Sequence, residues 1–301
     1  MKKIPVIIDT DPGIDDAMAL VILSKYLDKF DVKLMTSTCG NTPLVNTTKN
    51  LQFIAENYFP GTPVAKGSAS PINKVFVDAE DVHGKGGMGK YNVPNSKKKP
   101  LSDAVEAIYK VLMESNEKIT LVTLGPLTNI AKLFTKYPEC KKKIKVMYSM
   151  IGSICGDGNI KKYAEFNAYC DPTAFKIVSE SGVNMVINSL EIGNQSYVPQ
   201  SEFEKMTVNS KTDEFIKTIA LSINETVYSN VVCFYDPNTI VALVKPSLFE
   251  FVKCDLKVYD NKVYGGKSVM TENPNGHICY QKIKDLDKLN KFIMKNLTNN
   301  Q

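Results

Sequence analysis

Residues 4–23 read IPVIIDTDPGIDDAMALVIL, in which a cluster of acids separates two apolar runs. The short, β-branched run at residues 4–8 predicts a buried strand, and the longer run at residues 17–23 predicts a buried helix. The cluster therefore lies where a strand ends and a helix begins. In open α/β sheets, ligands collect at such junctions, outside the carboxyl ends of the strands. The four acids of the cluster are Asp9, Asp11, Asp15 and Asp16.

Four carboxylates within eight residues repel one another unless a positive charge lies among them. Two like charges about 4 Å apart repel by roughly 4 kcal/mol at an effective dielectric near 20. Clusters of carboxylate oxygens suit Ca²⁺ or Mg²⁺ and do not suit zinc. Capping by Asp11 and favourable contact of Asp15 and Asp16 with a helix dipole explain one or two acids, but not four. The cluster therefore predicts a metal or polar-ligand site.

The composition is that of an ordinary globular protein, with 43% apolar and 23% charged residues. We find no linker, repeat or low-complexity tract, so we expect a single domain over residues 1–301. The apolar run before Asp9 is too short for a signal peptide, and no stretch is long and apolar enough to span a membrane. We therefore expect a cytoplasmic protein with no membrane partner.

The cysteines and lysines exclude two further classes of protein. Seven cysteines, an odd number without a CxxC pair, indicate reduced thiols and neither a disulfide framework nor a zinc knuckle. The net charge of +5 comes from scattered lysines. The lysine runs at residues 97–99 and 141–143 have no aromatic residues between them, so we expect solvated faces and no nucleic-acid partner.

Strand-like and helix-like segments alternate along the rest of the chain. This alternation predicts an α/β fold with an open, mostly parallel sheet covered by helices on both faces, as in Rossmann-like cores. Glycine-rich residues 81–89 are expected to form a mobile active-site loop with no regular element. The predicted strands are residues 32–38, 63–66, 118–124, 144–150 and 183–189. The predicted helices are residues 47–58, 101–114, 171–181, 213–228 and 285–297, with another ending at residue 137.

Polar clusters recur where the predicted strands end. They are found at Asn41, at residues 124–129 and at residues 150–167, in addition to the first acidic cluster. The carboxyl ends of parallel strands meet at one edge of the sheet, so we expect all of these clusters to open on that edge.

The clusters contain six ordered motifs. They are Asp9-Thr10-Asp11-Pro12-Gly13-Ile14-Asp15-Asp16-Ala17, Cys39-Gly40-Asn41, Val82-His83-Gly84, Leu124-Gly125-Pro126-Leu127-Thr128-Asn129-Ile130-Ala131, Glu165-Phe166-Asn167 with Asp171-Pro172, and Asp236-Pro237. In this order they resemble the motifs of the calcium-dependent nucleoside hydrolases, over residues 4 to about 240. The resemblance implies hydrolysis of the N-glycosidic bond of ribonucleosides to free base and ribose. The sequence does not show whether these products enter nucleoside salvage.

The resemblance also implies a ligand set for Ca²⁺, made of Asp11, Asp16, Asp236 and the backbone carbonyl of Leu124. Ca²⁺ takes six to eight oxygen ligands, so carboxylates, a carbonyl, water and ribose hydroxyls suit it. A metal-bound water is more acidic than bulk water, and Asp11 is expected to accept its proton as it attacks the anomeric carbon.

The substrate-binding residues follow from the same resemblance. Asp15, Asn41 and Asn167 would hold the 2′ and 3′ hydroxyls of the ribose and the water. Asn159 and Glu165 would hold the 5′ hydroxyl, and Met150 would lie against the apolar face of the sugar. A polyol site needs convergent carboxylates and amides of this kind, and it rejects analogues that leave buried polar groups unpaired.

One position departs from the family. The broad-specificity branch has a histidine immediately before the late aspartate, and a purine-selective branch places a tryptophan there. This chain has Tyr235 at that position and has no tryptophan. A phenol with a pKa near 10 is a weak proton donor at neutral pH, so we expect its ring to stack on the base. His83 or Tyr228 is then expected to supply the acid.

Two other functions remain open from the sequence. A Mg²⁺-dependent phosphatase that forms an aspartyl phosphate also has a DxD after a strand, but it expects Thr or Val where this chain has Gly13. A non-catalytic nucleoside-binding protein would keep the ribose site without turnover. The sequence does not separate purine from pyrimidine substrates, and family members are commonly homodimers or homotetramers.

Overall fold

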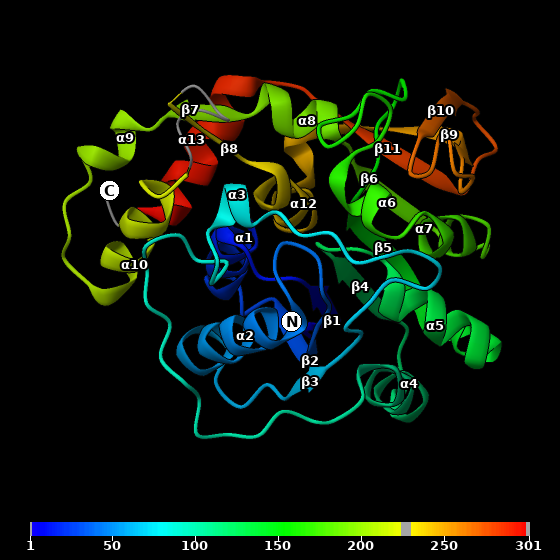
Figure 1. Cartoon of the computed structure of the whole chain (residues 1–301), viewed down its shortest axis with the longest axis horizontal. Helices are drawn as coiled ribbons and strands as arrows, with labels where there is room; N and C mark the ends of the chain where they lie inside the picture. Colours follow the sequence, from blue (N-terminus) through cyan, green and yellow to red (C-terminus); the bar gives the residue numbers. More distant parts are fainter. Residues whose placement is uncertain (1, 224–229, 299–301) are drawn as a thin grey trace.

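The computed structural model describes residues 2–223 and 230–298. Within them, a nine-stranded sheet has the order β10-β9-β11-β6-β5-β4-β1-β2-β3, and all neighbours are parallel except at the β9 edge. Figure 1 shows the helices around this sheet. The strands are β1 Ile4–Thr10, β2 Phe30–Ser37, β3 Val64–Lys66, β4 Ile119–Thr123, β5 Ile144–Met150, β6 Met185–Asn188, β9 Phe249–Val258, β10 Ser268–Glu272 and β11 Ile278–Ile283; β7 Tyr197–Pro199 and β8 Val231–Cys233 pair separately.

The helices cover both faces of the sheet, which confirms the predicted α/β fold. The α-helices are α1 Ile14–Ser24, α2 Leu44–Tyr58, α3 Glu80–His83, α4 Ala104–Glu114, α5 Thr128–Lys136, α6 Phe166–Cys170, α7 Pro172–Ser179, α8 Leu190–Gln195, α9 Ser201–Glu204, α10 Lys211–Ala220, α12 Tyr235–Val244 and α13 Leu286–Leu297. Two 3₁₀ helices span Pro138–Lys143 and Pro246–Leu248.

Strand β1 lies near the middle of the sheet, between β2 and β4. The chain leaves β1 toward β2 on one side and later returns to β4 on the other, so the strand order reverses beside β1. A crevice opens at such a reversal, outside the carboxyl ends of the strands. Asp11, Asp15 and Asp16 of the acidic cluster follow the end of β1 at Thr10, and Leu124 follows the end of β4. Both therefore lie at this crevice.

Alternate side chains of β1 enter two separate cores. Val6 and Ile8 pack with α1, α2, α10, α12 and α13, whereas Ile7 packs with α4, α5 and α7. This is the period-two alternation of a strand that is buried on both faces.

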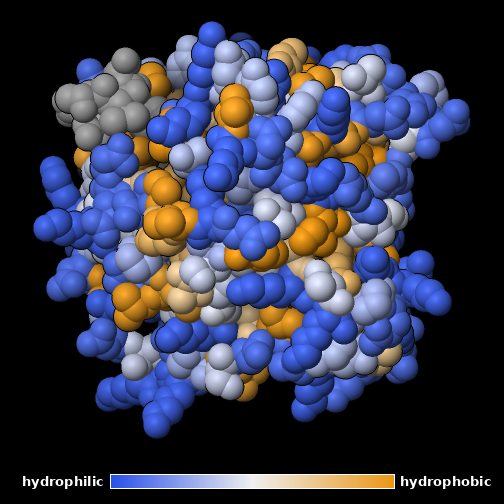
Figure 2. Space-filling model, turned by 45° about the vertical axis from the view of Figure 1, so that its right-hand side comes forward, coloured by the Kyte–Doolittle hydropathy of each residue, from blue (hydrophilic) through white to orange (hydrophobic). Residues whose placement is uncertain are grey.

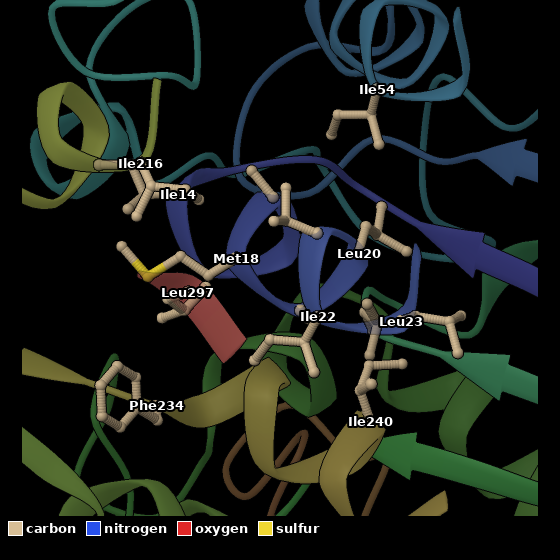
Figure 3. Packing of buried hydrophobic residues seen from close by; sticks show 14 of the residues in the cluster. Ile14, Met18, Leu20, Ile22, Leu23, Ile54, Ile216, Phe234, Ile240 and Leu297 are labelled. Carbon is tan, nitrogen blue, oxygen red and sulfur yellow. The ribbon is translucent and has the colours of Figure 1, made fainter. Parts of the chain in front are cut away.

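Helix α1 lies inside the first core. Every residue from Asp16 to Leu23 is buried, and α1 contacts α2, α10, α12 and α13. Figure 3 shows Met18 and Ile22 of α1 among side chains from these neighbours, including Ile240 of α12 and Leu297 of α13. A helix that is apolar on all sides is expected to be buried in this way.

Several sequence predictions need correction at their boundaries, including the helix predicted at residues 47–58, which begins at Leu44. Residues 80–83 form α3 within the segment predicted to be irregular, and α3 ends at Gly84, whose φ of +74° suits glycine. Helix α4 begins at Ala104 because the Asp103 side chain caps it. Helix α10 begins at Lys211 and ends at Ala220, and the end of the predicted helix at residues 224–228 lies outside the described residues.

No helix in residues 2–223 and 230–298 combines the length and the hydropathy that crossing a bilayer requires. On the face drawn in Figure 2, hydrophilic residues predominate and the hydrophobic ones form small separate groups.

Candidate active site

Three carboxylates converge at the crevice. Oxygens of Asp15, Asp16 and Asp236 lie within 4.8 Å of one another. The first two belong to the first turn of α1, and the third belongs to the first turn of α12. Packing of α1 against α12 therefore brings together acids that are 220 positions apart in the sequence.

Asp11 lies beside this group and is fully buried. The backbone N–H of Asn41 donates to its Oδ2 over 2.8 Å, while its Oδ1 has no hydrogen-bond partner among the described residues. Gly40 and Gly125 flank the carboxylate so closely that a Cβ at either position would collide with it. Glycine is required at both positions for this close approach.

Burial and mutual repulsion raise the pKa values of these acids. Burial raises the pKa of Asp11 well above its usual range, and the charge of Asp16 raises it further. The pKa of Asp236 is raised in the same way, by burial first and then by its acidic neighbours. Oδ1 of Asp15, like Oδ1 of Asp11, is buried and has no hydrogen-bond partner in the part of the chain that the structure describes. Unpaired buried carboxylate oxygens of this kind fit the needs of a hard cation.

Hydrogen bonds fix the orientation of Asp16. Its carboxylate accepts from the Thr10 hydroxyl, from the backbone N–H of Gly13 over 3.0 Å and from Nδ2 of Asn41 over 2.9 Å. The same Nδ2 is 3.2 Å from the backbone oxygen of Asp11. The amide donors of Asn41 therefore orient the acids, in addition to lying at the wall of the cavity described below.

Asp9 does not join the group, although it belongs to the same sequence cluster. Its carboxylate accepts from the Thr36 hydroxyl over 2.5 Å and from Nδ2 of Asn129 over 2.8 Å. Burial raises the pKa of Asp9 to about 6. Asp9 therefore connects β1 to β2 and α5, and Asp236 replaces it as the fourth acid of the site.

Asn167 connects the ends of β4 and β5. Its Nδ2 donates to the carbonyl of Leu124 over 2.8 Å and to the carbonyl of Met150 over 3.1 Å. Both carbonyls therefore lie at the site, together with the Met150 side chain, whose sulfur is 3.5 Å from the same nitrogen.

Glu165 caps helix α6. Its carboxylate accepts from the backbone N–H groups of Gly152, Asn167 and Ala168 over 2.7–3.0 Å. Burial raises its pKa to about 7. The side chain therefore joins the 152–165 loop to α6, a role that the sequence analysis missed. Asn159 belongs to the same loop and donates its backbone N–H to the carbonyl of Ala164.

His83 is buried and in its neutral form. Its Nδ1 accepts from the backbone N–H of Ile14 over 3.1 Å, so the ring proton is on Nε2. Burial lowers the pKa of His83 to about 4, and Nδ1 lies 4.0 Å from Oδ1 of Asp15. A Cβ at Gly13 would lie 2.6 Å from the same nitrogen. The glycine of the first motif thus makes room for this histidine.

Tyr235 begins helix α12. Its hydroxyl donates to Oδ1 of Asn194 over 2.8 Å, and its backbone carbonyl accepts from Nδ2 of Asn188 over 2.5 Å. The ring lies against Gly193, where any Cβ would collide with it. No motif in the sequence marks Asn194 or Gly193, and only the packing of α8 against α12 identifies them. Tyr228 lies outside the described residues.

Most of these side chains line one cavity of about 650 Å³. Asp11 and Asp16 are fully buried and do not line it. The lining includes the residues predicted from the sequence, namely Asp15, Asn41, His83, Leu124, Met150, Asn159, Glu165, Asn167, Tyr235 and Asp236. It also includes Asp78, Asp81, Asn194, Tyr197 and Cys233, which the sequence analysis did not identify.

The open parallel sheet and the acidic cavity at its strand reversal define an α/β enzyme with a site for a polar, hydroxyl-rich substrate. The model of the inosine-uridine preferring nucleoside hydrolase family matches residues 6–292. The chain belongs to that family, whose members are enzymes that act on N-glycosyl bonds. The resemblance seen in the sequence is thereby confirmed.

Similar proteins agree with this assignment. The non-specific ribonucleoside hydrolase RihC of Klebsiella pneumoniae is 34% identical over 257 residues, which are 85% of this chain and 84% of that protein. A plant nucleoside hydrolase, the PpNRh1 enzyme, is 26% identical with a TM-score of 0.90, over 99% of this chain and 100% of its own. The purine-preferring ribonucleoside hydrolase from Gardnerella vaginalis is 23% identical, covers 98% of both chains and has a TM-score of 0.90, a likeness of fold.

Proposed function

We propose that this protein hydrolyses the N-glycosidic bond of ribonucleosides to give ribose and the free base. The observation that carries the proposal is the cavity of about 650 Å³ in which carboxylates and amides converge. Its volume suits a small molecule that is largely enclosed, and its polar lining suits the hydroxyl groups of a ribose.

We propose Ca²⁺ as the cofactor, held by Asp11, Asp16, Asp236 and the backbone carbonyl of Leu124. The fit rests on carboxylate and carbonyl oxygens only, and on the unpaired buried Oδ1 of Asp11. Asp15 lies close enough to share the ion or a substrate hydroxyl. When bound, such an ion offsets the repulsion among the acids and makes a coordinated water more acidic.

Asp11 is the proposed proton acceptor. Asn41 anchors one oxygen of its carboxylate through the backbone N–H, which leaves the other oxygen without a hydrogen bond. A base that is fixed at one oxygen and unpaired at the other can take a proton from an attacking water without first breaking a hydrogen bond. Gly40 and Gly125 lie against the carboxylate and leave just enough room for it at this position.

Asp15 and the two asparagines Asn41 and Asn167 are proposed to hold the ribose hydroxyls. Oδ1 of Asp15 is buried and has no hydrogen bond within residues 2–223 and 230–298, so it can accept from a hydroxyl. Glycosyl hydrolysis passes through a sugar with oxocarbenium character, which nearby carboxylates stabilise. Asn159 and Glu165 are proposed to lie at the 5′ hydroxyl, and Met150 against the sugar face.

The leaving base is proposed to meet Tyr235 and His83. The Tyr235 ring is fixed by Gly193 and Asn194, so it offers a rigid stacking surface. The Nε2–H of neutral His83 can donate a hydrogen bond without carrying a charge. A role for Tyr228 as a second proton donor to the leaving base stays a prediction, because that residue lies outside the described residues.

The test compares inosine and uridine with their 2′-deoxy analogues. We expect a deoxynucleoside to lose about 10³-fold or more in kcat/KM, because it leaves buried polar groups unpaired. Release of base and reducing sugar is measured for each substrate. Comparable rates with inosine and deoxyinosine would contradict the proposed ribose contacts. Binding without any release of base would identify a nucleoside-binding protein, and release of phenolate from p-nitrophenyl phosphate would identify a phosphatase.

We propose a single domain, a cytoplasmic location and a homodimer or homotetramer. Light scattering of the purified protein measures the oligomeric state, and a panel of purine and pyrimidine nucleosides measures the base preference.

A further inference from the structure

A second cavity lies outside the active site. It has a volume of about 470 Å³ and is formed by residues 161–164, the start of α7 and the turn at residues 260–265 between β9 and β10. Figure 1 shows α7 and the β9–β10 turn at the same end of the sheet, and α7 contacts β9. We call this cavity the lysine groove. Its charged lining residues are Lys74, Lys161, Lys162, Lys262 and Asp260.

The lysines of the groove lack anionic partners. None of the four lies within 4.0 Å of a carboxylate among the described residues, although eight lysine–carboxylate pairs occur elsewhere in them. Lys74 is half-buried, and its ammonium donates to the backbone carbonyl of Tyr169. Burial lowers the pKa of Lys74 to about 8. The single aspartate leaves most of the positive charge uncompensated, which favours an anionic ligand.

Tyrosine rings lie among these lysines. Tyr163, Tyr169 and Tyr264 all line the groove, and the rings of Tyr163 and Tyr264 meet edge to face with centroids 5.5 Å apart. The ammonium of Lys267 is 5.1 Å from the Tyr163 ring and 5.5 Å from the Tyr264 ring. Tyr264 is 41% exposed, so part of its surface is available to a ligand. Aromatic faces beside ammonium groups can bind both parts of a nucleotide, the base by stacking and the phosphates by charge.

The loop that forms the groove also forms the active site. Asn159 and Glu165 line the active-site cavity, whereas residues 161–164 between them line the lysine groove. The loop is pinned by the pairing of Lys161 with Ala164 and by the hydrogen bond from Asn159 to Ala164. The two cavities are therefore separate but share one wall, so a ligand in the groove contacts the loop that presents Asn159.

We propose that the lysine groove binds a nucleoside diphosphate, with its phosphates on Lys161, Lys162 and Lys262 and its base on the Tyr163 and Tyr264 rings. The volume suits one mononucleotide, and the aromatic faces favour a nucleotide over free phosphate. By bracing the 159–165 loop, the nucleotide changes the KM for the nucleoside substrate. The site is distinct from the proposed active site, and its binding step does not depend on hydrolysis.

The test is calorimetric titration of the full chain with ADP and with inorganic pyrophosphate, at a constant buffered concentration of free Ca²⁺. We expect ADP to bind more tightly than pyrophosphate. The variant Lys161→Ala/Lys162→Ala/Lys262→Ala should lose both ligands, and Tyr163→Ala/Tyr264→Ala should lose about tenfold in affinity for ADP alone, because only ADP has a base to stack. In wild type, ADP should also change the KM for inosine, and the lysine variant should abolish that change.

The matched control is Lys141→Ala/Lys142→Ala/Lys143→Ala, which removes the same charge from a 3₁₀ helix elsewhere. This control should bind ADP as the wild type does. Equal losses in the two lysine variants would show a general charge effect and overturn the proposal. Equal affinity for ADP and pyrophosphate, with no effect of the tyrosine substitutions, would mean that the groove binds only phosphate groups and would overturn the proposed nucleotide site. Affinity for single-stranded RNA that rises with its length would identify a different ligand.

Discussion

The hydroxyl of Tyr235 donates its hydrogen bond to Oδ1 of Asn194 over 2.8 Å. The proton that could activate a leaving base is therefore committed to an amide oxygen of α8. The ring itself is held against Gly193, where no side chain larger than hydrogen fits. Gly193 and Asn194 fix the position of the Tyr235 ring. We therefore expect the ring, and not the acidity of the hydroxyl, to act on the base.

The first prediction therefore separates the ring of Tyr235 from its hydroxyl. Tyr235→Phe loses one hydrogen bond with a net value of about 0.5–1.5 kcal/mol and should keep most of the activity. Tyr235→Ala removes the stacking surface, which contributes roughly 1–3 kcal/mol per base, and should lose activity strongly. The measurement is kcat/KM with inosine. If Phe is as damaging as Ala, the hydroxyl is the active group.

Gly193→Ala provides an independent check on the same ring. The added methyl group displaces Tyr235, so the loss should resemble that of Tyr235→Ala, and combining the two changes should add little. Gly86→Ala is the matched control, because a Cβ there meets no atom within 4 Å and its φ is not in the left-handed range. Full additivity of the two losses would mean that Gly193 acts apart from the ring.

The second prediction concerns Asp11. Asp11→Asn keeps the shape of the side chain and can still accept the Asn41 N–H, so the fold and the affinity for substrate should persist. An amide cannot accept the proton of the attacking water, so kcat should fall by about 10²–10⁴-fold. Thermal unfolding and substrate binding serve as controls for the fold. Turnover near that of the wild type would place the base elsewhere.

The third prediction concerns the metal. Purified active protein should contain Ca²⁺ by elemental analysis, and exhaustive chelation should abolish activity that added Ca²⁺ restores. Asp16→Ala removes one carboxylate of the group and should weaken both metal content and activity. Chelated protein that is fully active, or activity restored by Mg²⁺ and not by Ca²⁺, would contradict the proposed ion.

The fourth prediction concerns His83. Because Nδ1 accepts from Ile14 and Nε2 carries the proton, glutamine can replace both functions with its oxygen and nitrogen. His83→Gln should therefore stay within about tenfold of wild type in kcat, whereas His83→Ala should lose more. The pH profile of kcat should keep its shape in the Gln variant. A basic limb that disappears equally in both variants would show that an imidazolium delivers the proton.

Much of the fold follows from hydrophobic periodicity. The strand predicted at residues 144–150 is β5 without change, and the first predicted strand does lead into a helix, although β1 continues to Thr10, two residues beyond its predicted end. Two of the helix boundaries differ from the prediction because a local capping group decides them. Asp103 starts α4 three residues late, and the Ser210 side chain, which accepts from Asp213, starts α10 two residues early. Such capping contacts depend on single polar side chains, and the pattern of hydrophobic residues does not reveal them.

The site was predictable as a set of residues but not as a set of contacts. Strand ends in a parallel sheet must meet, so the sequence placed Asn41, Leu124 and Asn167 together. It could not show that Glu165 turns its carboxylate to three backbone N–H groups, nor that Asp9 points away to Asn129. Those orientations depend on the packing of loops and helices that are distant in the sequence. Asn194 has no signal in the sequence at all.

The burial of helix α1 links loss of activity to unfolding of the whole protein. Asp15 and Asp16 begin a helix whose residues from 16 to 23 have no contact with solvent, so that helix cannot fray without opening the first core. Its amide protons should exchange with deuterated water only when the whole chain unfolds, and exchange at α3 should be far faster. Heat inactivation and loss of tertiary structure should then share one midpoint. Asp15 and Asp16 should therefore keep their positions until the protein unfolds globally.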